Sequence, residues 1–252
     1  ERTKERVAIL VDEYEDPIHD AINDLELAKI HRQVLLTFYT SIKALADGDM
    51  THLVYVTGKT KFTQTSIFSS FNNLSDLTLN PDYNAACGFT LEEFETYFSQ
   101  YLLGMLKYNQ SKGFMSATAS LEELKNDIIN YYDGYSWTGK TRILNPFSLI
   151  KMLDLKWLKP YWFDPSTQSF IIELLKRKER EFEFPVNPTM STNSLSAVDL
   201  DNIRLIPILF QMGYLTIEKI LKPGEYLLRR PNKEVNEAIE SKLFNLWLGQ
   251  TT

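Results

Sequence analysis

The first strong pattern along the chain is an uninterrupted run of five apolar residues, Val7–Val11, followed at once by the acids Asp12 and Glu13. Such a run is typical of a strand in a parallel sheet, whose two faces are both covered. Ligands gather at the carboxyl ends of these strands. The pattern therefore predicts a strand that is buried on both faces and delivers two carboxylates to a site.

Helical periodicity follows from about Ile18 to Asp47, with a break expected near Asn23-Asp24. A second apolar run, His52–Thr57, predicts another strand. Strand, helix and strand together form a right-handed crossover between two parallel strands. We therefore expect Asp12 and Thr57 at the same edge of one sheet.

The middle of the chain carries four signals for helix starts. Thr90 and Ser120 each begin a capping box with a Glu three residues later. A capping residue is followed by proline at Asn145-Pro146 and at Asp164-Pro165. These closely spaced starts predict an all-helical lobe over residues 89–186.

The stretch 187–196 is rich in Ser, Thr, Asn and Pro, which predicts a linker. Beyond it the pattern is a helix that ends near Met212, a hairpin that turns at Lys222-Pro223-Gly224-Glu225, and a helix capped by Asn232. This order is similar to a winged-helix module. Because its basic residues are matched by as many acids, we favour packing within the chain over DNA recognition. The predicted domains are residues 1–88, 89–186 and 187–252.

Composition narrows the class of protein. The chain has 252 residues, of which 44% are apolar, and a formal net charge of −6. That balance is typical of a soluble globular protein and argues against coating nucleic acid by bulk charge. Cys87 is the single cysteine, so an internal disulfide is excluded. No apolar run approaches the length of a membrane span, and no membrane partner is expected.

Asp12 and Glu13 have two interpretations. In P-loop nucleotide hydrolases a strand-end acid holds Mg²⁺ and the next acid polarises the attacking water. Asp12 would then be the metal ligand and Glu13 the catalytic acid. The alternative is a buried strand that ends in an exposed acidic turn. The following Glu15, Asp16 and His19 are explained as helix-start residues, which favour acids at the positive end of the dipole.

The sequence Thr57-Gly58-Lys59-Thr60 contains GKT after a predicted strand, yet it does not fit a phosphate-binding loop. That loop requires GxxxxGK followed by Ser or Thr, because the earlier residues supply the amides of an anion nest. The position five residues before Gly58 is Leu53, which lies within the strand. We therefore expect the amides around Lys59 to enter the sheet ladder instead of facing a ligand.

The run VDEYEDPIHD, which begins at Val11, resembles the LIDEYDxPI motif of bacterial AAA-ATPase-like proteins. The resemblance continues in the family's order through VTGKTKFTQTSIFSSFNNLSDLTLNP, CGFTLEEFETYF, YYDGYSW, NPFSL and LFQMGYLTI, and so covers nearly the whole chain. It implies an α/β fold, in which an incomplete P-loop NTPase (AAA-like) parallel sheet is followed by a helical lid and a winged-helix-like module. Members commonly carry a PD-(D/E)XK nuclease-type domain at the C-terminus.

The resemblance also implies roles for two residues after the second strand. Thr57 takes the place of sensor 1, a polar group that faces the γ-phosphate or the attacking water. Lys61 is a further nucleotide-binding candidate. The alternative is a strand-end threonine and a solvated lysine. ATP and Mg²⁺ are the implied cofactors.

We expect the Walker A segment of this family upstream of Glu1, in a longer polypeptide. We expect this chain alone to bind no ATP. Two functions stay open. One is an ATPase-like module that regulates or positions an attached nuclease-type or effector domain. The other is a non-catalytic scaffold that contacts a partner protein or nucleic acid through the winged-helix-like lobe. The implied location is the bacterial cytoplasm, or a host cell if the chain belongs to an effector.

Overall fold

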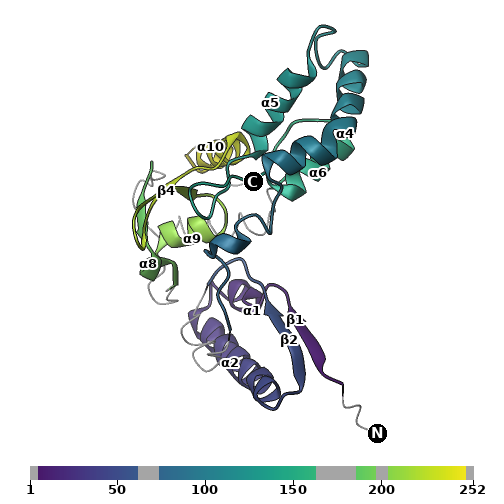
Figure 1. Ribbon diagram of the computed structural model, residues 1–252. Coiled ribbons are helices and arrows are strands. Elements are labelled where there is room, and N and C mark those ends of the chain that lie inside the picture. Colours follow the sequence, from purple (N-terminus) through teal and green to yellow (C-terminus); the bar gives the residue numbers. More distant parts are fainter. Residues whose placement is uncertain (1–4, 62–73, 163–185, 197–203, 248–252) are drawn as a thin grey trace. The chain divides into compact units, whose positions relative to one another are not determined.

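The computed structural model describes residues 5–61, 74–162, 186–196 and 204–247 (Figure 1). The chain forms two compact units. The described residues of the first lie in 5–61, 74–75, 190–196 and 204–212, and those of the second in 76–162, 186–189 and 213–247. None of the helices within these ranges has the length and apolarity needed to cross a bilayer. The helix start predicted at Asp164-Pro165 lies outside the described residues, and the three-domain division stays a prediction.

The first unit is built on a pair of parallel strands. β1 (Val7–Val11) pairs with β2 (Thr51–Val56), and Val11 lies opposite Val56 at the carboxyl ends. Two helices make the connection, α1 (Asp16–Asp20) and α2 (Leu25–Asp47). The side chain of Asp24 caps α2 by accepting from the Leu27 amide. The predicted crossover and the break between its helices are confirmed.

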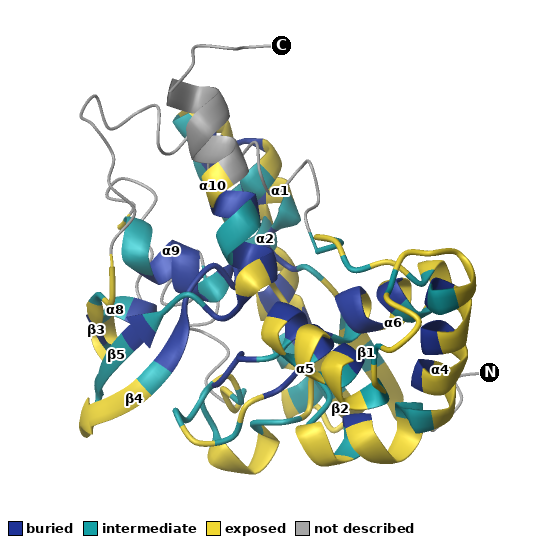
Figure 2. Ribbon diagram, turned by 90° about the horizontal axis from the view of Figure 1, so that it is seen from above, coloured by how far each residue is buried: buried dark blue, intermediate teal, exposed yellow. Residues whose placement is uncertain are grey.

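The prediction that β1 is buried on both faces is wrong for the described chain. Ile9 and Val11 are half-buried, whereas Leu10 is 70% exposed and Tyr55 of β2 is 48% exposed. Figure 2 colours the described chain by burial. Helix α2 packs against β2. Successive side chains of a strand point to opposite faces, so a sheet with helical cover on one face leaves every second side chain open.

Two short helices complete the first unit, α8 (Thr192–Ser196) and α9 (Leu205–Gln211). The side chain of Gln211 links them to the turn after β2. Its Nε2 donates to the Leu195 carbonyl at 2.7 Å, and its Oε1 accepts from the Lys61 amide at 2.7 Å. The turn is thereby fixed from the side of α9.

The second unit contains the predicted helices. A short 3₁₀ turn, η1 (Pro81–Tyr83), precedes α4 (Leu91–Ser111), α5 (Leu121–Tyr132) and α6 (Pro146–Leu155). Both predicted capping boxes are present, at Thr90 and Ser120, and both are complete. The three helices enclose an apolar core of Phe94, Leu102, Met105, Leu106, Leu124, Ile128, Tyr131, Tyr132, Leu144, Leu149 and Met152.

The predicted hairpin and final helix are also confirmed. β4 (Thr216–Lys222) and β5 (Glu225–Arg229) are antiparallel and lead to α10 (Lys233–Trp247). Asn232 Oδ1 accepts from the Val235 amide at 3.0 Å and so caps α10. A further short strand is β3 (Thr189–Ser191).

Gly134 fixes the turn that follows α5. Its φ is +118°, and a Cβ added there would lie 2.2 Å from the Pro231 carbonyl oxygen. Arg229 donates to the Gly134 carbonyl at 2.9 Å. Only glycine accommodates both the positive φ and this close approach, so Gly134 has a structural role in the turn.

Candidate functional site

The carboxyl ends of β1 and β2 bring three predicted site residues together. The Thr57 hydroxyl donates to Asp12 Oδ1, and the Glu13 amide donates to Thr57 Oγ1 at 3.3 Å. Glu13 has a φ of +51°, in the left-handed region that a residue with a long side chain rarely adopts. The chain therefore turns sharply between the two acids, directly at the strand end.

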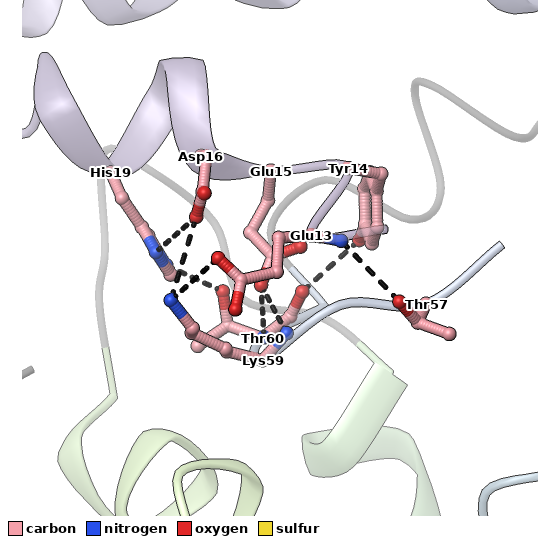
Figure 3. A network of polar contacts seen from close by, with 8 residues as sticks. All are labelled: Glu13, Tyr14, Glu15, Asp16, His19, Thr57, Lys59 and Thr60. Atoms are coloured by element: carbon pink, nitrogen blue, oxygen red, sulfur yellow. Dashed lines mark hydrogen bonds and ion pairs between the residues drawn. The ribbon is translucent and has the colours of Figure 1, made fainter. Parts of the chain in front are cut away.

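Lys59 reaches Glu13 and Asp16 from the turn after β2. Its Nζ lies 2.8 Å from Glu13 Oε2 and 3.8 Å from Asp16 Oδ1 (Figure 3). The hydrogen bond from Lys59 holds the pKa of Glu13 below its usual range. Burial opposes the charge on Lys59, but the hydrogen bond to Glu13 and the neighbouring carboxylates outweigh burial and raise its pKa. The two groups form an ion pair at neutral pH.

Glu15 is fully buried and its side chain binds the backbone of the same turn. Oε1 of Glu15 accepts from the amides of Lys59 and Thr60, the second at 2.7 Å. One expectation is therefore incomplete and another is wrong. Glu15 stands at the start of α1, as expected, but its carboxyl binds the turn after β2. The amide of Lys59 does not enter the ladder, because β2 ends at Val56 and the turn beyond it faces the Glu15 carboxyl.

Burial sets the charge state of Glu15. Removal from water raises the pKa of Glu15 to about 7, although the hydrogen bonds that its carboxyl accepts from two amides lower it. His19 is shifted in the opposite direction. Burial, assisted by the charge of Lys59, lowers the pKa of His19 to about 4. The imidazole is therefore neutral at physiological pH.

Thr60 connects the turn after β2 to the segment that follows β1. Its amide donates to Glu15, its hydroxyl lies 2.8 Å from His19 Nε2, and its carbonyl accepts from the Tyr14 hydroxyl at 3.2 Å. Thr60 is only 2% exposed. Every polar group of this residue is thus bound by the segment that follows β1, as Figure 3 shows.

The sequence interpretation missed much of this arrangement. It named Asp12, Glu13, Thr57 and Lys61, and the structure places Lys61 beside Gln211 through its amide. The residues that it assigned no site role are Tyr14, Glu15, Asp16, His19, Lys59 and Thr60. A signal for them was available: if two parallel strands end at one edge, the residues directly after each strand meet.

Asp12 is the residue that the sequence predicts to hold a metal ion. It is exposed at the strand end and touches the Thr57 hydroxyl, and Mg²⁺ binds through one or two carboxylates while keeping several waters. Among the described residues, no three His, Cys, Asp or Glu side chains are grouped so as to hold a metal. The assignment of Asp12 to Mg²⁺ stays a prediction.

Comparison with known proteins gives a family match for the first part of the chain and one similar protein for nearly all of it. Residues 1–68 match a family model described as predicted AAA-ATPase. The chain is also similar to "Uncharacterized protein in vnfD 5'region" of Azotobacter chroococcum mcd 1, with 33% identity over 249 residues, or 97% of this chain and 44% of that protein. It therefore spans less than half the length of this relative. No solved structure matches the chain significantly.

Proposed function

We propose that residues 1–68 form the metal- and water-handling half of an AAA-ATPase-like site for ATP hydrolysis. The family match over this segment supports the proposal. The observation that carries it is the contact between Asp12, Glu13 and Thr57 at the ends of two parallel strands. Such an edge gathers ligands in α/β proteins.

Each of these residues has a role that its environment suits. Asp12 is exposed and would hold Mg²⁺, which would supply positive charge to the phosphate oxygens. Glu13 polarises the attacking water, and its lowered pKa keeps it ionised at neutral pH. Thr57 touches Asp12 and the Glu13 amide, and it senses the phosphate at the same edge. Lys61 is the weaker candidate for a nucleotide contact.

The phosphate-binding loop belongs to another part of a longer polypeptide in this proposal. Residues 134–141 (GYSWTGKT) match GxxxxGKT, but they follow helix α5 instead of a strand, and helix α6 begins only at Pro146. The amides of Ser136 and Gly139 donate to Thr216 Oγ1 and Ser136 Oγ, so they are not free to face a phosphate. The amides of Lys59 and Thr60, the residues of the GKT turn that resemble such a loop, already donate to Glu15. A loop that binds phosphate needs amides that are free to face it. The attached nuclease-type or effector domain would be the part that hydrolysis regulates.

Turnover of ATP by that longer polypeptide tests the proposal. Glu13→Gln should preserve Mg-ATP binding and lower kcat by about two orders of magnitude or more, because one step loses its water-polarising group. Asp12→Asn should instead weaken the Mg²⁺-dependent part of binding. Glu26→Gln is the matched control, since Glu26 is exposed on α2 and pairs with Lys29. Unchanged turnover in both site variants would exclude these roles.

A second candidate function is a scaffold that has kept the fold without the chemistry. The observation that favours it is the ion pair itself, because Lys59 Nζ occupies Glu13 Oε2 at 2.8 Å. An occupied carboxylate is a weak partner for water. If this function holds, the wild-type longer polypeptide and its Glu13→Gln variant bind the partner protein or nucleic acid equally well, and neither form shows turnover.

A further inference from the structure

We propose that Glu15 is the positioning residue of this site: its buried carboxyl fixes the turn after β2 and thereby sets where the Lys59 ammonium meets Glu13. The inference deepens the proposed function and rests on it for its catalytic meaning. Glu13 is the acid to which that function gives the water-polarising role. The contact between Glu15 and the turn stands independently of any reaction.

The geometry of the turn carries the inference. Lys59 is bound at both ends, with its amide on Glu15 and its Nζ on Glu13. Its backbone is therefore fixed before its side chain extends. Gly58 allows this approach, because a Cβ there would lie 2.2 Å from Glu15 Oε2 and 2.6 Å from the Tyr14 ring. A carboxyl in this position leaves no room for a side chain at residue 58.

The Glu15 carboxyl can accept more hydrogen bonds than the described residues donate to it. Oε1 accepts both amides, whereas Oε2 is buried and has no hydrogen-bond partner among the described residues. A cap at a helix start ordinarily accepts from its own helix, but Glu15 makes no side-chain cap bond to α1. Its side chain is directed to the turn instead. Because the Glu15 side chain binds the turn and not its own helix, its role is to position the turn and not to cap α1.

The charged and titratable groups around Glu15 come from every element that packs there. They are Glu13 and Tyr14 after β1, Asp16, His19 and Asp20 on α1, Tyr39 on α2 and Lys59 after β2. Lys59 is the only one of these that is cationic at neutral pH, because His19 is neutral. A substitution of Glu15 should therefore change the ion pair between Lys59 and Glu13 before any other charged contact.

Nuclear magnetic resonance of the whole chain tests the inference through two observables. The first is the pH dependence of the Lys59 and Thr60 amide shifts. Both should follow one titration in the wild type, because both amides donate to one carboxyl. Glu15→Gln keeps an acceptor oxygen but cannot titrate, so this shared titration should disappear. Glu26→Gln is the control and should leave it unchanged.

The second observable is the pKa of Glu13, followed by the carbon resonance of its carboxyl. Lys59→Met gives the full effect of removing the ammonium, which is a rise toward the ordinary value. Glu15→Ala should produce most of that rise although it leaves Lys59 in place. Gly58→Ala should do the same by displacing the carboxyl. Glu15→Gln should retain the low pKa, because its oxygen still accepts the amides.

Two results would overturn the positioning role. One is a Glu13 pKa that stays at its wild-type value in both Glu15→Ala and Gly58→Ala. The other is an absence of any shared titration of the two amides in the wild type. If Glu15→Ala fails to fold, Gly58→Ala and Glu15→Gln decide the question by the same measurements.

ATP turnover separates this inference from the proposed function. In the longer polypeptide, Glu15→Ala should lower kcat roughly tenfold with KM little changed, and Glu15→Gln should restore most of it. A wild type without turnover contradicts the proposed function, while the resonance measurements still decide the role of Glu15. Normal turnover in Glu15→Ala contradicts the positioning role and leaves the proposed function intact.

Discussion

Each of the two units contains a buried glutamate that performs the same local task. Glu15 accepts from the amides of Lys59 and Thr60 in the first unit. Glu234 accepts from the amides of Tyr161 and Trp162 in the second, at 2.7 and 3.1 Å. Both are fully buried, both use Oε1, and in both Oε2 has no hydrogen-bond partner within the described residues. Burial raises the pKa of each carboxyl.

The two glutamates differ in the groups to which they are connected beyond these amides. Glu234 also accepts from the Ser148 hydroxyl at 2.8 Å, and its charge acts on the buried Tyr135. Glu15 instead leads to Lys59 and from there to Glu13 at the end of a strand. A buried carboxylate that binds two amides is therefore no indication of a site by itself. The indication is the ion pair that it positions at an accessible edge.

The largest expected effect is that of Glu234→Ala. The substitution leaves two backbone amides and the Ser148 hydroxyl without their acceptor. Each buried donor left unpaired costs about 1–3 kcal/mol, and the two amides are only partly buried, so the free energy of unfolding should fall by roughly 3–5 kcal/mol. Urea denaturation measures this, with the exposed Glu122→Ala as control. A loss below about 1 kcal/mol would show that Glu234 is dispensable to the second unit.

Glu15→Ala should destabilise the first unit by less, about 2–3 kcal/mol, because it removes one acceptor from two amides. The comparison is sharpest when both variants are measured by the same denaturant titration, with probes in each unit. If Glu15→Ala proves more costly than Glu234→Ala, the turn after β2 holds the first unit together and its ionic role is secondary.

The pH dependence of stability should separate Glu15 from His19. Glu15 has a pKa of about 7 in the folded chain against an ordinary 4.5, so the folded state holds more protons and its contribution is lost as pH rises through 7. His19 has a pKa of about 4 against an ordinary 6.5, so its contribution grows as pH rises from 4 to 6.5. The two slopes oppose each other over most of this range.

Single variants should expose each slope. Relative to wild type, Glu15→Gln should gain stability as pH rises from 4.5 to 7, and His19→Gln should lose stability as pH rises from 4 to 6.5. Each slope is at most about 1.4 kcal/mol per pH unit. Denaturant titrations at half-unit intervals measure both. Parallel curves for all three proteins would mean that neither group titrates differently in the folded state.

The smallest effect on stability is expected for Lys59→Met. Its ion pair with Glu13 is about one-third exposed on both sides, and pairs of this kind contribute about 0–1 kcal/mol. Unfolding experiments should therefore find little change, even though the pKa of Glu13 rises. A loss of several kcal/mol would make Lys59 a structural residue and remove the contrast with Glu234.

The backbone of this arrangement was predictable from local sequence. The apolar runs at β1 and β2, the helix break near Asp24 and the two capping boxes each depend on residues close together in the chain. The parallel pairing followed from the helical segment predicted between the two strands. These features need no knowledge of what covers the sheet.

Burial and the polar junction were less accessible to sequence reasoning. A run such as Val7–Val11 predicts two covered faces, yet exposure depends on how many layers the surrounding chain provides, and Leu10 is open. Judged from the sequence alone, Glu15 could act as a helix-start acid or as a hydrogen-bond acceptor for a distant turn. Only the position of Thr60 in space decides between them.

Calorimetric titration of this 252-residue chain with Mg-ATP tests the central claim most directly, namely that the GKT turn of residues 58–60 is held by Glu15 and binds no phosphate. The account predicts no saturable binding up to about millimolar ATP, because a phosphate site needs free amides at a helix N-terminus. Saturable binding that Lys59→Ala abolishes would contradict it and would make this turn the phosphate site.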